Sequence, residues 1–312
     1  MKYSVVIPLY NKENYICKTV NSVLSQHFQD YEIIVVNDGS TDCSLEKVSE
    51  IKSDKLKIIN QENQGVAVAR NTGIEHASGE YIAFLDADDE WKSDYLETID
   101  ELTEKYPQSD IYVTAYNVIM GKEKVKHSTQ LGSEPGCLEN YWLTLKYSYD
   151  FVWTSATVIK KAAILKAGGF RAGEKIGQDL DLWVRVARNN TKVAYSPKLC
   201  VNYNRMAEAN ARNRVKVAWA KAYIQDLEEE LSNPLHSAEA LAMIKHKYDL
   251  KMTVYIFTCI LAGEKCRAKE ALKSWKGKNT RETFVLKTGL RIAAFMPTFV
   301  NRTLYNIRLK VF

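Results

Sequence analysis

Three carboxylates stand directly after a short apolar run in the sequence EYIAFLDADDEW, residues 80–91. The run Tyr81–Leu85 has the length and composition of a buried parallel strand, and ligands bind beyond the carboxyl ends of such strands. Asp86, Asp88 and Asp89 follow it and repel one another. A hard divalent cation such as Mg²⁺ or Mn²⁺ would relieve that repulsion and could also bind phosphate. The alternative is a strand end with turn-forming Asp residues before a helix that begins near Ser93.

A fourth carboxylate, Asp179, lies at the start of a predicted helix. Gly168 and Gly169 interrupt the chain, a loop containing Gly and Lys follows, and the helix begins at Gln178. An Asp at a helix start is favoured electrostatically and as a cap, so capping alone would explain it. We expect Asp181, two residues further on, to be structural.

Alternating strands and helices must position these carboxylates. Apolar runs predict four strands, and helical spacing between them predicts helices at 15–24, 45–51 and 66–76; the strands are Ser4–Leu9, Glu32–Val36, Leu56–Asn60 and Tyr81–Leu85. Four such βα units predict a parallel sheet with helices on both faces. The polar strand ends at 10–11, 37–42 and 86–89 are then expected at one rim.

The remainder of the chain is less regular and then helical. Ile111–Met120 and Trp153–Lys160 are predicted strands, and Lys122–Gly136 is a predicted loop. From about Arg205 the pattern is helical, with predicted helices at 216–231, 237–261 and 268–275 and an amphipathic segment at 283–312.

Two common phosphate-binding motifs are absent from the sequence. A dinucleotide fold needs G-x-G-x-x-G after the first strand and a P-loop needs GxxxxGK[ST], whereas the first strand here ends in PLYNKEN. A phosphatase that forms an aspartyl-phosphate also carries Asp-x-Asp, but this sequence continues with Asp89-Glu90 where a small hydroxyl residue is wanted. A metal held by carboxylates is then the obvious means of binding phosphate.

The composition is that of a globular protein of one or two domains, with 312 residues, 46% of them hydrophobic and 26% charged. Six cysteines without metal-ligand spacing predict neither a zinc site nor disulfides, which favours a reducing, cytoplasmic location. The N-terminal sequence does not suggest a signal peptide. The best candidate for a spanning segment, Met252–Ala262, has about half of the ~20 residues that a bilayer needs.

Positive charge is concentrated near the C-terminus. Residues 265–312 contain twelve Lys or Arg against two Glu, a net charge of +10, so the net +5 of the chain leaves −5 for residues 1–264. Together with the apolar residues of 283–312, this predicts helices that lie on an anionic membrane surface. The alternative is a helix packed on the body with its basic face in water. Nucleic-acid binding is not expected, because no recognition-helix or zinc pattern accompanies the charge.

Six ordered motifs resemble those of glycosyltransferase family 2, the inverting nucleotide-sugar transferases of the GT-A fold. The resemblance spans roughly residues 3–205, and its motifs are VVIPLYN (5–11), SVLSQ (22–26), EIIVVNDGSTD (32–42), NQGVAVARNTGI (63–74), GEYIAFLDADD (79–89) and GQDLDLWVRVA (177–187). It implies an α/β fold with a mostly parallel, Rossmann-like sheet flanked by helices. The expected domains are a GT-A domain at 1–205 and a helical, basic extension at 206–312.

The resemblance also implies a donor site. The end of the first strand and the NDGSTD turn would hold the base and ribose of a UDP-sugar, here Pro8, Tyr10 and Asp38; an aromatic ring can stack on uracil and an Asp can accept its imide N–H. Arg70 would lie towards the donor phosphates or support the acidic turn, with a structural salt bridge as the alternative. Asp86 would bind ribose or sugar hydroxyls.

The chemistry implied by the resemblance needs one metal ligand and one base. Asp88 would hold the Mg²⁺ or Mn²⁺ that bridges the diphosphate, and Asp179 would be the general base that deprotonates the acceptor hydroxyl. Trp153 and Trp183 could stack on acceptor sugars, although an aromatic residue on a helix such as Trp183 is more often part of a core.

Two departures from the family pattern are visible. The family's Glu-Asp pair is Gln178-Asp179 here, and the Tyr-Arg-x-His segment of many members is Tyr203-Asn204-Arg205-Met206, without a histidine. Any role of that histidine is in doubt, and one of three arginines could supply the positive charge instead: Arg205, Arg212 or Arg214.

The expected function is transfer of a hexose or N-acetylhexosamine from a UDP-sugar to a hydroxyl of a growing surface glycan, such as O-antigen or capsule, or of a polyprenyl-diphosphate-linked sugar. The expected location is the cytoplasm, peripheral at the inner face of the membrane. The alternatives are a sugar nucleotidyltransferase, which would want a Gly-rich first loop, and a noncatalytic glycan-binding scaffold, which would not need Asp88 and Asp179 together.

Overall fold

The computed structural model of the chain describes residues 1–121, 125–128, 132–147, 151–174, 176–205, 220–276 and 290. The chain divides into two compact units, Met1–Asn210 and Ala211–Phe312, and each unit is described by itself.

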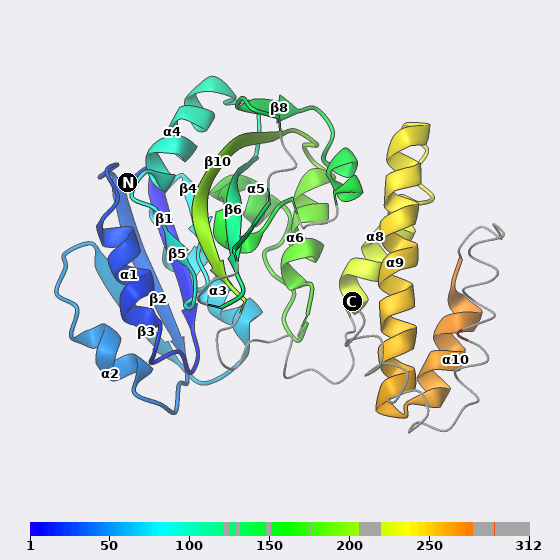
Figure 1. The fold of residues 1–312 in the computed structure, drawn as a ribbon, viewed down its shortest axis with the longest axis horizontal. Coiled ribbons are helices and arrows are strands. Elements are labelled where there is room, and N and C mark those ends of the chain that lie inside the picture. The colour runs from blue at the N-terminus through cyan, green and yellow to red at the C-terminus, as the bar shows by residue number, and fades with distance from the viewer. Residues whose placement is uncertain are drawn as a thin grey trace. The chain divides into compact units, whose positions relative to one another are not determined.

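The first unit is built on a ten-stranded sheet with helices packed on it (Figure 1). The strand order is β3-β2-β1-β4-β9-β6-β10-β5, with β7 paired to β6 and β8 paired to β10. The strands are β1 (Tyr3–Leu9), β2 (Tyr31–Asp38), β3 (Leu56–Gln61), β4 (Tyr81–Phe84), β5 (Glu90–Trp91), β6 (Ile111–Ile119), β7 (Val125–His127), β8 (Gly136–Leu138), β9 (Thr157–Lys160) and β10 (Val193–Asn204).

Helices connect most of these strands. They are α1 (Ile16–Leu24), α2 (Ser44–Ser49), α3 (Val66–His76), α4 (Tyr95–Lys105), α5 (Lys161–Lys166) and α6 (Gln178–Ala187). Two 3₁₀ helices, Tyr141–Lys146 and Thr154–Ala156, lie in the segment between β8 and β9.

The predicted α/β fold is confirmed. Strands β3, β2, β1 and β4 pair in parallel, and β10 pairs in parallel with β6. The pairings of β9, β5, β7 and β8 are antiparallel, so the sheet is mixed beyond β4.

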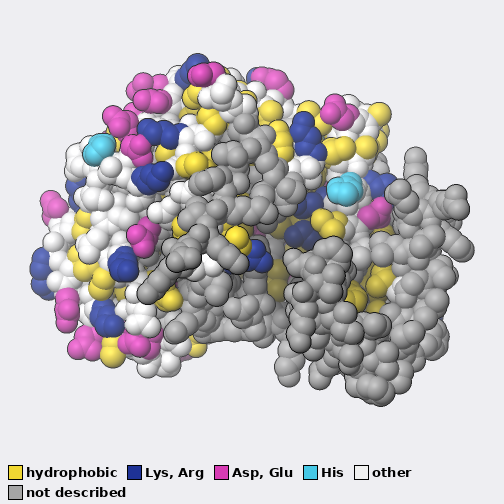
Figure 2. Space-filling view, in the orientation of Figure 1, with side chains coloured by type: hydrophobic (Ala, Val, Ile, Leu, Met, Phe, Trp, Pro, Cys, Tyr) yellow, Lys and Arg dark blue, Asp and Glu magenta, His cyan; other side chains and the backbone are white. Residues whose placement is uncertain are grey.

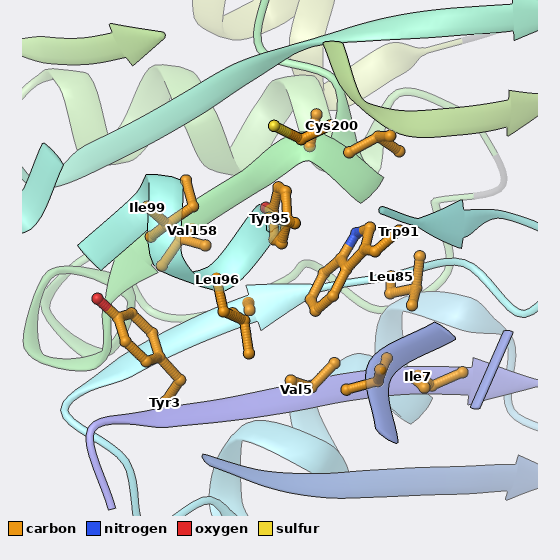
Figure 3. Packing of buried hydrophobic residues seen from close by; sticks show 14 of the residues in the cluster. Tyr3, Val5, Ile7, Leu85, Trp91, Tyr95, Leu96, Ile99, Val158 and Cys200 are labelled. Carbon is orange, nitrogen blue, oxygen red and sulfur yellow. The ribbon is translucent and has the colours of Figure 1, made fainter. Parts of the chain in front are cut away.

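Both faces of the central strands are buried, which is why β1 is apolar apart from Ser4. Successive side chains of a strand point to opposite faces. Val5 and Ile7 belong to a cluster that includes Trp91 and Tyr95 (Figure 3). On the other face Val6 lies so close to Gly73 of α3 that a Cβ on this glycine would be 2.4 Å from Val6 Cγ1, so the helix and strand pack without an intervening side chain.

The second unit contains three described helices: α8 (Lys221–Glu230), α9 (Ala238–Ala262) and α10 (Lys265–Ser274). The Ser237 hydroxyl accepts a hydrogen bond from the Ala240 N–H and caps α9, which ends at Gly263 with φ 82°. Trp275 Nε1 donates to Asp249 Oδ1 at 2.7 Å and joins the end of α10 to α9. Within the residues that the structure describes, no helix is both long and apolar enough to cross a membrane.

The strand predictions for the second half of the sheet were partly wrong. Strand β10 was not predicted, and only residues 157–160 of the predicted strand 153–160 are extended. The predicted loop at 122–136 contains the short strand β7. The helices expected at 237–261 and 268–275 are confirmed as α9 and α10, whereas the amphipathic segment at 283–312 lies outside the described residues, Leu290 excepted.

Candidate active site

The candidate site lies at the topological switch point of the sheet, between β1 and β4. The chain runs from β1 outwards to β2 and β3, and then returns to place β4 on the other side of β1. In open α/β sheets, ligands bind at such a point, outside the carboxyl ends of the strands. We call this edge the carboxyl-end rim and define it as residues 10–12, 37–44 and 85–89.

Hydrogen bonds hold the loops of the rim together. Asn11 adopts φ 52°, which is uncommon for a residue other than glycine, and its Oδ1 accepts a hydrogen bond from the Thr41 N–H at 2.8 Å. The Lys12 N–H donates to Ser44 Oγ at 2.8 Å. The predicted convergence of the first two strand ends is therefore observed.

The three carboxylates after β4 have different partners. Asp86 Oδ1 accepts a hydrogen bond from Arg70 Nη2 at 2.6 Å, and Asp88 Oδ2 accepts one from Lys12 Nζ at 2.6 Å. Asp89 is buried; its Oδ2 accepts from the Ser155 hydroxyl and its Oδ1 from the Asn204 N–H. Asp89 therefore anchors the turn, while Asp86 and Asp88 are partly exposed at the rim.

Burial makes this turn electrostatically unfavourable. It raises the pKa of Asp88; the Lys12 ammonium opposes that rise and the neighbouring Asp86 charge adds to it. Burial also raises the pKa of Asp89 well above its ordinary value, and the charges of Asp88 and Asp86 add to the effect. A cation bound here would lower the cost of keeping the carboxylates ionised.

Arg70 supplies unsatisfied hydrogen-bond donors at the same place. Only 3% of its side chain is exposed, its guanidinium carbon lies 5.3 Å from the centre of the Phe170 ring, and Nη2 binds Asp86. Its Nε and Nη1 are buried and have no hydrogen-bond partner among the described residues. Buried donors without partners are costly, which is consistent with a site that a polar or anionic ligand completes.

Both carboxylate oxygens of Asp38 accept hydrogen bonds from other residues of the protein. Its Oδ1 accepts hydrogen bonds from Gln61 Nε2 at 2.7 Å and the Gln64 N–H at 2.9 Å, and its Oδ2 accepts one from the Gly65 N–H at 2.9 Å. Asp38 thus fixes the turn that leads into α3. Pro8 and Tyr10, at the end of β1, are half-buried.

Asp179 lies in the first turn of α6 and is half-buried. Gly177, with φ 75° in the left-handed region, precedes the helix. Asp179 Oδ2 accepts a hydrogen bond from the Thr154 hydroxyl at 2.7 Å, and Oδ1 accepts one from the Leu180 N–H at 2.9 Å. These two contacts fix the orientation of the carboxylate.

Two consecutive residues connect this carboxylate to the rim. Thr154 binds Asp179, and the hydroxyl of Ser155 both binds Asp89 and accepts the Asp86 N–H at 3.1 Å. Adjacent Cα atoms of a chain are about 3.8 Å apart, so the start of α6 lies beside the turn after β4. The structure therefore brings Asp179 together with the carboxylates of residues 86–89.

Asp181 differs from Asp179, as the sequence predicted. It is fully buried and pairs with Arg171 Nη1 at 2.5 Å and with Arg185 Nη2 at 2.6 Å. Trp183 is also buried, against Phe84 and Phe170, and is part of the core rather than a sugar platform. Trp153 is half-buried and packs on Tyr116 and Tyr203.

The carboxylates fit a divalent cation only in part. Asp86 and Asp88 offer hard oxygen ligands, and Asp88 already binds one cation, the Lys12 ammonium. No group of three or more His, Cys, Asp or Glu residues that could hold a metal occurs among the described residues. A metal at Asp88 would therefore need further ligands from a bound phosphate or from water.

Sequence reasoning missed three contributors to this site. Lys12 is one of many lysines in polar segments, and its pairing with Asp88 across 76 residues has no local signal. Thr154 and Ser155 were assigned to a strand, whereas they form a 3₁₀ turn that directs both hydroxyls to the site.

Of the three arginines proposed in place of the family's histidine, Arg205 is exposed, with its Nη1 3.9 Å from the Met120 sulfur. Arg212 and Arg214 lie outside the described residues.

Comparisons with known proteins identify the family of the sequence. A sequence profile described as Glycosyl transferase family 2 matches residues 4–167. Glycosyltransferase GlyA of Streptococcus pneumoniae serotype 4 is 31% identical over 241 residues, covering 74% of this chain and 34% of that protein. The putative teichuronic acid biosynthesis glycosyltransferase TuaG of Bacillus subtilis is 46% identical over 97 residues, covering 30% of this chain and 38% of that protein. The chain thus spans about a third of the length of these relatives.

Solved structures share the fold at low sequence identity. Residues 1–349 of Staphylococcus aureus TarS, in complex with UDP-GlcNAc, superpose with a TM-score of 0.66 at 18% identity, covering 83% of this chain and 81% of that one. The mannosyltransferase PcManGT of Pyrobaculum calidifontis, in complex with GDP-Man and Mn²⁺, gives 0.58 at 17% identity, covering 99% and 86%. At this level of identity the likeness concerns the fold.

Proposed function

This chain belongs to glycosyltransferase family 2, and we propose that it is an inverting enzyme that transfers a hexose or N-acetylhexosamine from a UDP-sugar to an acceptor hydroxyl. The acceptor in this proposal is a growing surface glycan or a polyprenyl-diphosphate-linked sugar. The proposed catalytic domain is 1–205, and 206–312 is a helical extension.

The link through Thr154 and Ser155 is the observation that carries the proposal. It joins Asp179, which has one oxygen on a hydroxyl donor and one on a backbone N–H, to a turn with two partly exposed carboxylates. An inverting transferase needs a base on one side of the sugar and charge stabilisation for the diphosphate on the other. A noncatalytic scaffold would not require both on the same rim.

The donor is proposed to bind along the carboxyl-end rim. Tyr10, next to Pro8, would stack on the base of the donor. Asp38 would accept a hydrogen bond from the imide N–H of that base, or would hold the turn that accepts this hydrogen bond. Arg70 would donate its two unpaired nitrogens to the donor, and Asp86, already paired with Arg70, would accept ribose or sugar hydroxyls. The UDP-GlcNAc of TarS and the GDP-Man of PcManGT support a nucleotide sugar as the class of donor.

Asp179 is the proposed general base. It takes the proton of the acceptor hydroxyl while that oxygen attacks the anomeric carbon opposite the diphosphate, and the configuration inverts. Thr154 and the Leu180 N–H hold the carboxylate in one orientation for this transfer. Asp88 would hold Mg²⁺ or Mn²⁺, which when bound supplies positive charge that stabilises the leaving diphosphate.

Attachment to the inner face of the membrane is a further part of the proposal. Five of the twelve basic residues of 265–312 lie in the described residues 265–276, which include α10: Lys265, Arg267, Lys269, Lys273 and Lys276. On the face of the first unit that is visible in Figure 2, acidic and basic side chains are interspersed. Each Lys or Arg near anionic lipid contributes on the order of 1 kcal/mol, so the basic C-terminal segment would be the attachment site.

Vesicle pelleting tests the attachment. The full chain is expected to pellet with vesicles that contain anionic lipid and to remain in solution with neutral vesicles. A chain that ends at Glu264 is expected to pellet less. Equal pelleting of the two chains would contradict the attachment and would leave the transferase proposal untouched.

Product analysis tests the transferase proposal. Purified protein is incubated with a panel of UDP-sugars and Mn²⁺, with and without candidate acceptors, and UDP and pyrophosphate are measured. We expect UDP release that depends on the acceptor. In a parallel reaction with UTP and sugar 1-phosphates, release of pyrophosphate would indicate a nucleotidyltransferase, and release of neither product from any of these substrates would favour a scaffold.

A further inference from the structure

Lys12 is the closest cationic partner that the structure records for Asp88, and the proposed function assigns it no role. Its Nζ lies 2.6 Å from Asp88 Oδ2, and each of the two side chains is only 13% exposed. The pair is therefore shielded from solvent, unlike an ordinary surface salt bridge.

The backbone of Lys12 is fixed, whereas its side chain is long. Its N–H binds Ser44 Oγ, and the preceding Asn11 is held at φ 52° by the 40–41 turn through Ser40 and Thr41. Four rotatable bonds then separate this anchor from the ammonium group. Lys12 can therefore move its charge over several ångströms of the rim without moving the loop.

The ammonium occupies a position that a metal would need. Mg²⁺ bound to Asp88 would lie about 2.0–2.1 Å from a carboxylate oxygen, and one of the two oxygens already accepts a hydrogen bond from the Lys12 ammonium. Two cations at one carboxylate repel each other, so metal binding and the Lys12–Asp88 pair oppose each other.

We propose that Lys12 is an exchangeable counter-ion of Asp88: it neutralises the carboxylate before the donor binds, and it leaves the carboxylate for the diphosphate when a nucleotide and a divalent cation bind together. This inference rests on the proposed function, because it takes Asp88 as the metal ligand and a nucleoside diphosphate as the leaving group. It makes Lys12 a residue that couples donor binding to metal binding. Without nucleotide, Lys12 competes with the metal; with nucleotide, the phosphates draw the ammonium away from Asp88.

Manganese titrations test the exchange in the full-length protein. The free Mn²⁺ signal in electron paramagnetic resonance gives the Mn²⁺ Kd, with and without saturating UDP, for the wild type and Lys12→Met. Without UDP we expect Lys12→Met to bind Mn²⁺ about tenfold more tightly, a difference of about 1.4 kcal/mol. The factor by which UDP and Mn²⁺ strengthen each other's binding is expected to fall about tenfold in the variant.

Two further variants make the result specific. Lys47→Met removes a positive charge from α2, where Lys47 contacts Glu13 rather than Asp88. It is expected to change the Mn²⁺ Kd less than about twofold, because Lys47 is partly exposed and its charge is screened by solvent and salt. Asp88→Asn is expected to abolish Mn²⁺ binding. Retained binding in Asp88→Asn would contradict the metal assignment in the proposed function.

The exchange of Lys12 and the role of Asp88 as metal ligand can be contradicted by different results. If Asp88→Asn loses Mn²⁺ but Lys12→Met binds it no more tightly than the wild type, Lys12 does not compete with the metal and the exchange is wrong. Weaker Mn²⁺ binding in Lys12→Met would also overturn it. Melting curves establish that each variant is folded, and Lys12→Gln replaces Lys12→Met if the latter is not.

Discussion

Polar side chains hydrogen-bond to one another at the amino ends of β1, β2 and β4, whereas beside the carboxyl ends of the same strands Nε and Nη1 of Arg70 have no partner among the described residues. At the amino ends, Glu32 Oε1 accepts hydrogen bonds from the Ser4 hydroxyl, the Ser78 N–H and the Ser78 hydroxyl at 2.6–2.7 Å. The Ser4 hydroxyl in turn accepts one from the Gly79 N–H at 2.8 Å. We call these four residues the amino-end latch.

The pKa of Glu32 and the pKa values of the two buried carboxylates after β4 also shift in opposite directions. Burial alone would raise the pKa of Glu32, but its hydrogen bonds from Ser4 and Ser78 outweigh burial and lower it. In the turn after β4, burial dominates and the pKa values of Asp88 and Asp89 are raised, whereas hydrogen bonds lower the pKa of Asp42 elsewhere on the rim. The comparison indicates that the latch contributes to stability, while the rim carries a cost that a ligand can relieve.

Replacement of Asp88 should give the largest loss of activity without a large loss of stability. For Asp88→Asn we expect the rate of acceptor-dependent UDP release to fall about 10²- to 10³-fold, since charge stabilisation of this kind is worth several kcal/mol. The melting temperature should change little, because the variant removes an unfavourable charge together with an ion pair. A cooperative loss of folding would mean that Asp88 is structural.

Replacement of Thr154 should have an intermediate effect on the rate. Thr154→Val keeps the shape of the side chain but removes the hydrogen bond to Asp179, and we expect kcat to fall about tenfold, equivalent to about 1.4 kcal/mol, with KM for the donor nearly unchanged. Thr154→Ser retains the hydroxyl and should restore most of kcat. If Thr154→Val and Thr154→Ser were equally active, the contact would not position the base.

Replacement of Glu32 should lower the stability of the protein and leave its activity unchanged. Glu32→Ala leaves Ser4 and Ser78 without their acceptor, and we expect urea denaturation to show a loss of about 1–2 kcal/mol, at the lower end because the site is partly exposed. The kcat should stay at the wild-type value. Glu75→Ala, at an exposed position of α3, is the control and should change neither quantity.

The smallest expected effect is a difference between Glu32 and Asp89 in how their ionisation changes stability with pH. Because the pKa of Glu32 is lowered on folding, its contribution is present above the ordinary value of 4.5 and is lost as pH falls below it. Because the pKa of Asp89 is raised on folding, its ionisation destabilises the protein as pH rises from the ordinary value of 3.8.

Melting temperatures measured in steps from pH 3 to 7 check these opposite signs. Glu32→Ala should reduce the loss of stability on the acid side. Asp89→Asn should reduce the loss of stability as pH rises above 3.8. Identical pH profiles for the two variants would remove the electrostatic difference between the two ends of the sheet.

Local sequence patterns were sufficient for the first half of the fold. The first four strands and the helices between them follow from apolar runs and helical spacing, because the spacing of apolar residues within each segment matches the surface that the segment buries. The meeting of residues 10–11, 37–42 and 86–89 at one rim followed from the rule that parallel strands end at the same edge.

The second half depended on tertiary contacts that leave no local pattern. Strand β10 contains Pro197, and its register to β6 shifts between Ser196 and Leu199 and again before Val201, so alternation of polar and apolar residues is broken. The hydroxyls of Thr154 and Ser155 reach the site only because a 3₁₀ turn replaces the expected strand. The candidate residues could be named from the sequence, but the groups that orient them could not.

Acceptor-dependent UDP release by Asp179→Asn, measured alongside UDP binding in the presence of Mn²⁺, tests the central claim most directly. The claim is that the carboxylate at the start of α6 and the carboxylates after β4 serve one reaction. We predict that the variant binds UDP with a Kd within about twofold of the wild type while its rate falls about 10³-fold or more, because a general base contributes about 10²–10⁴. A rate close to that of the wild type would contradict the claim.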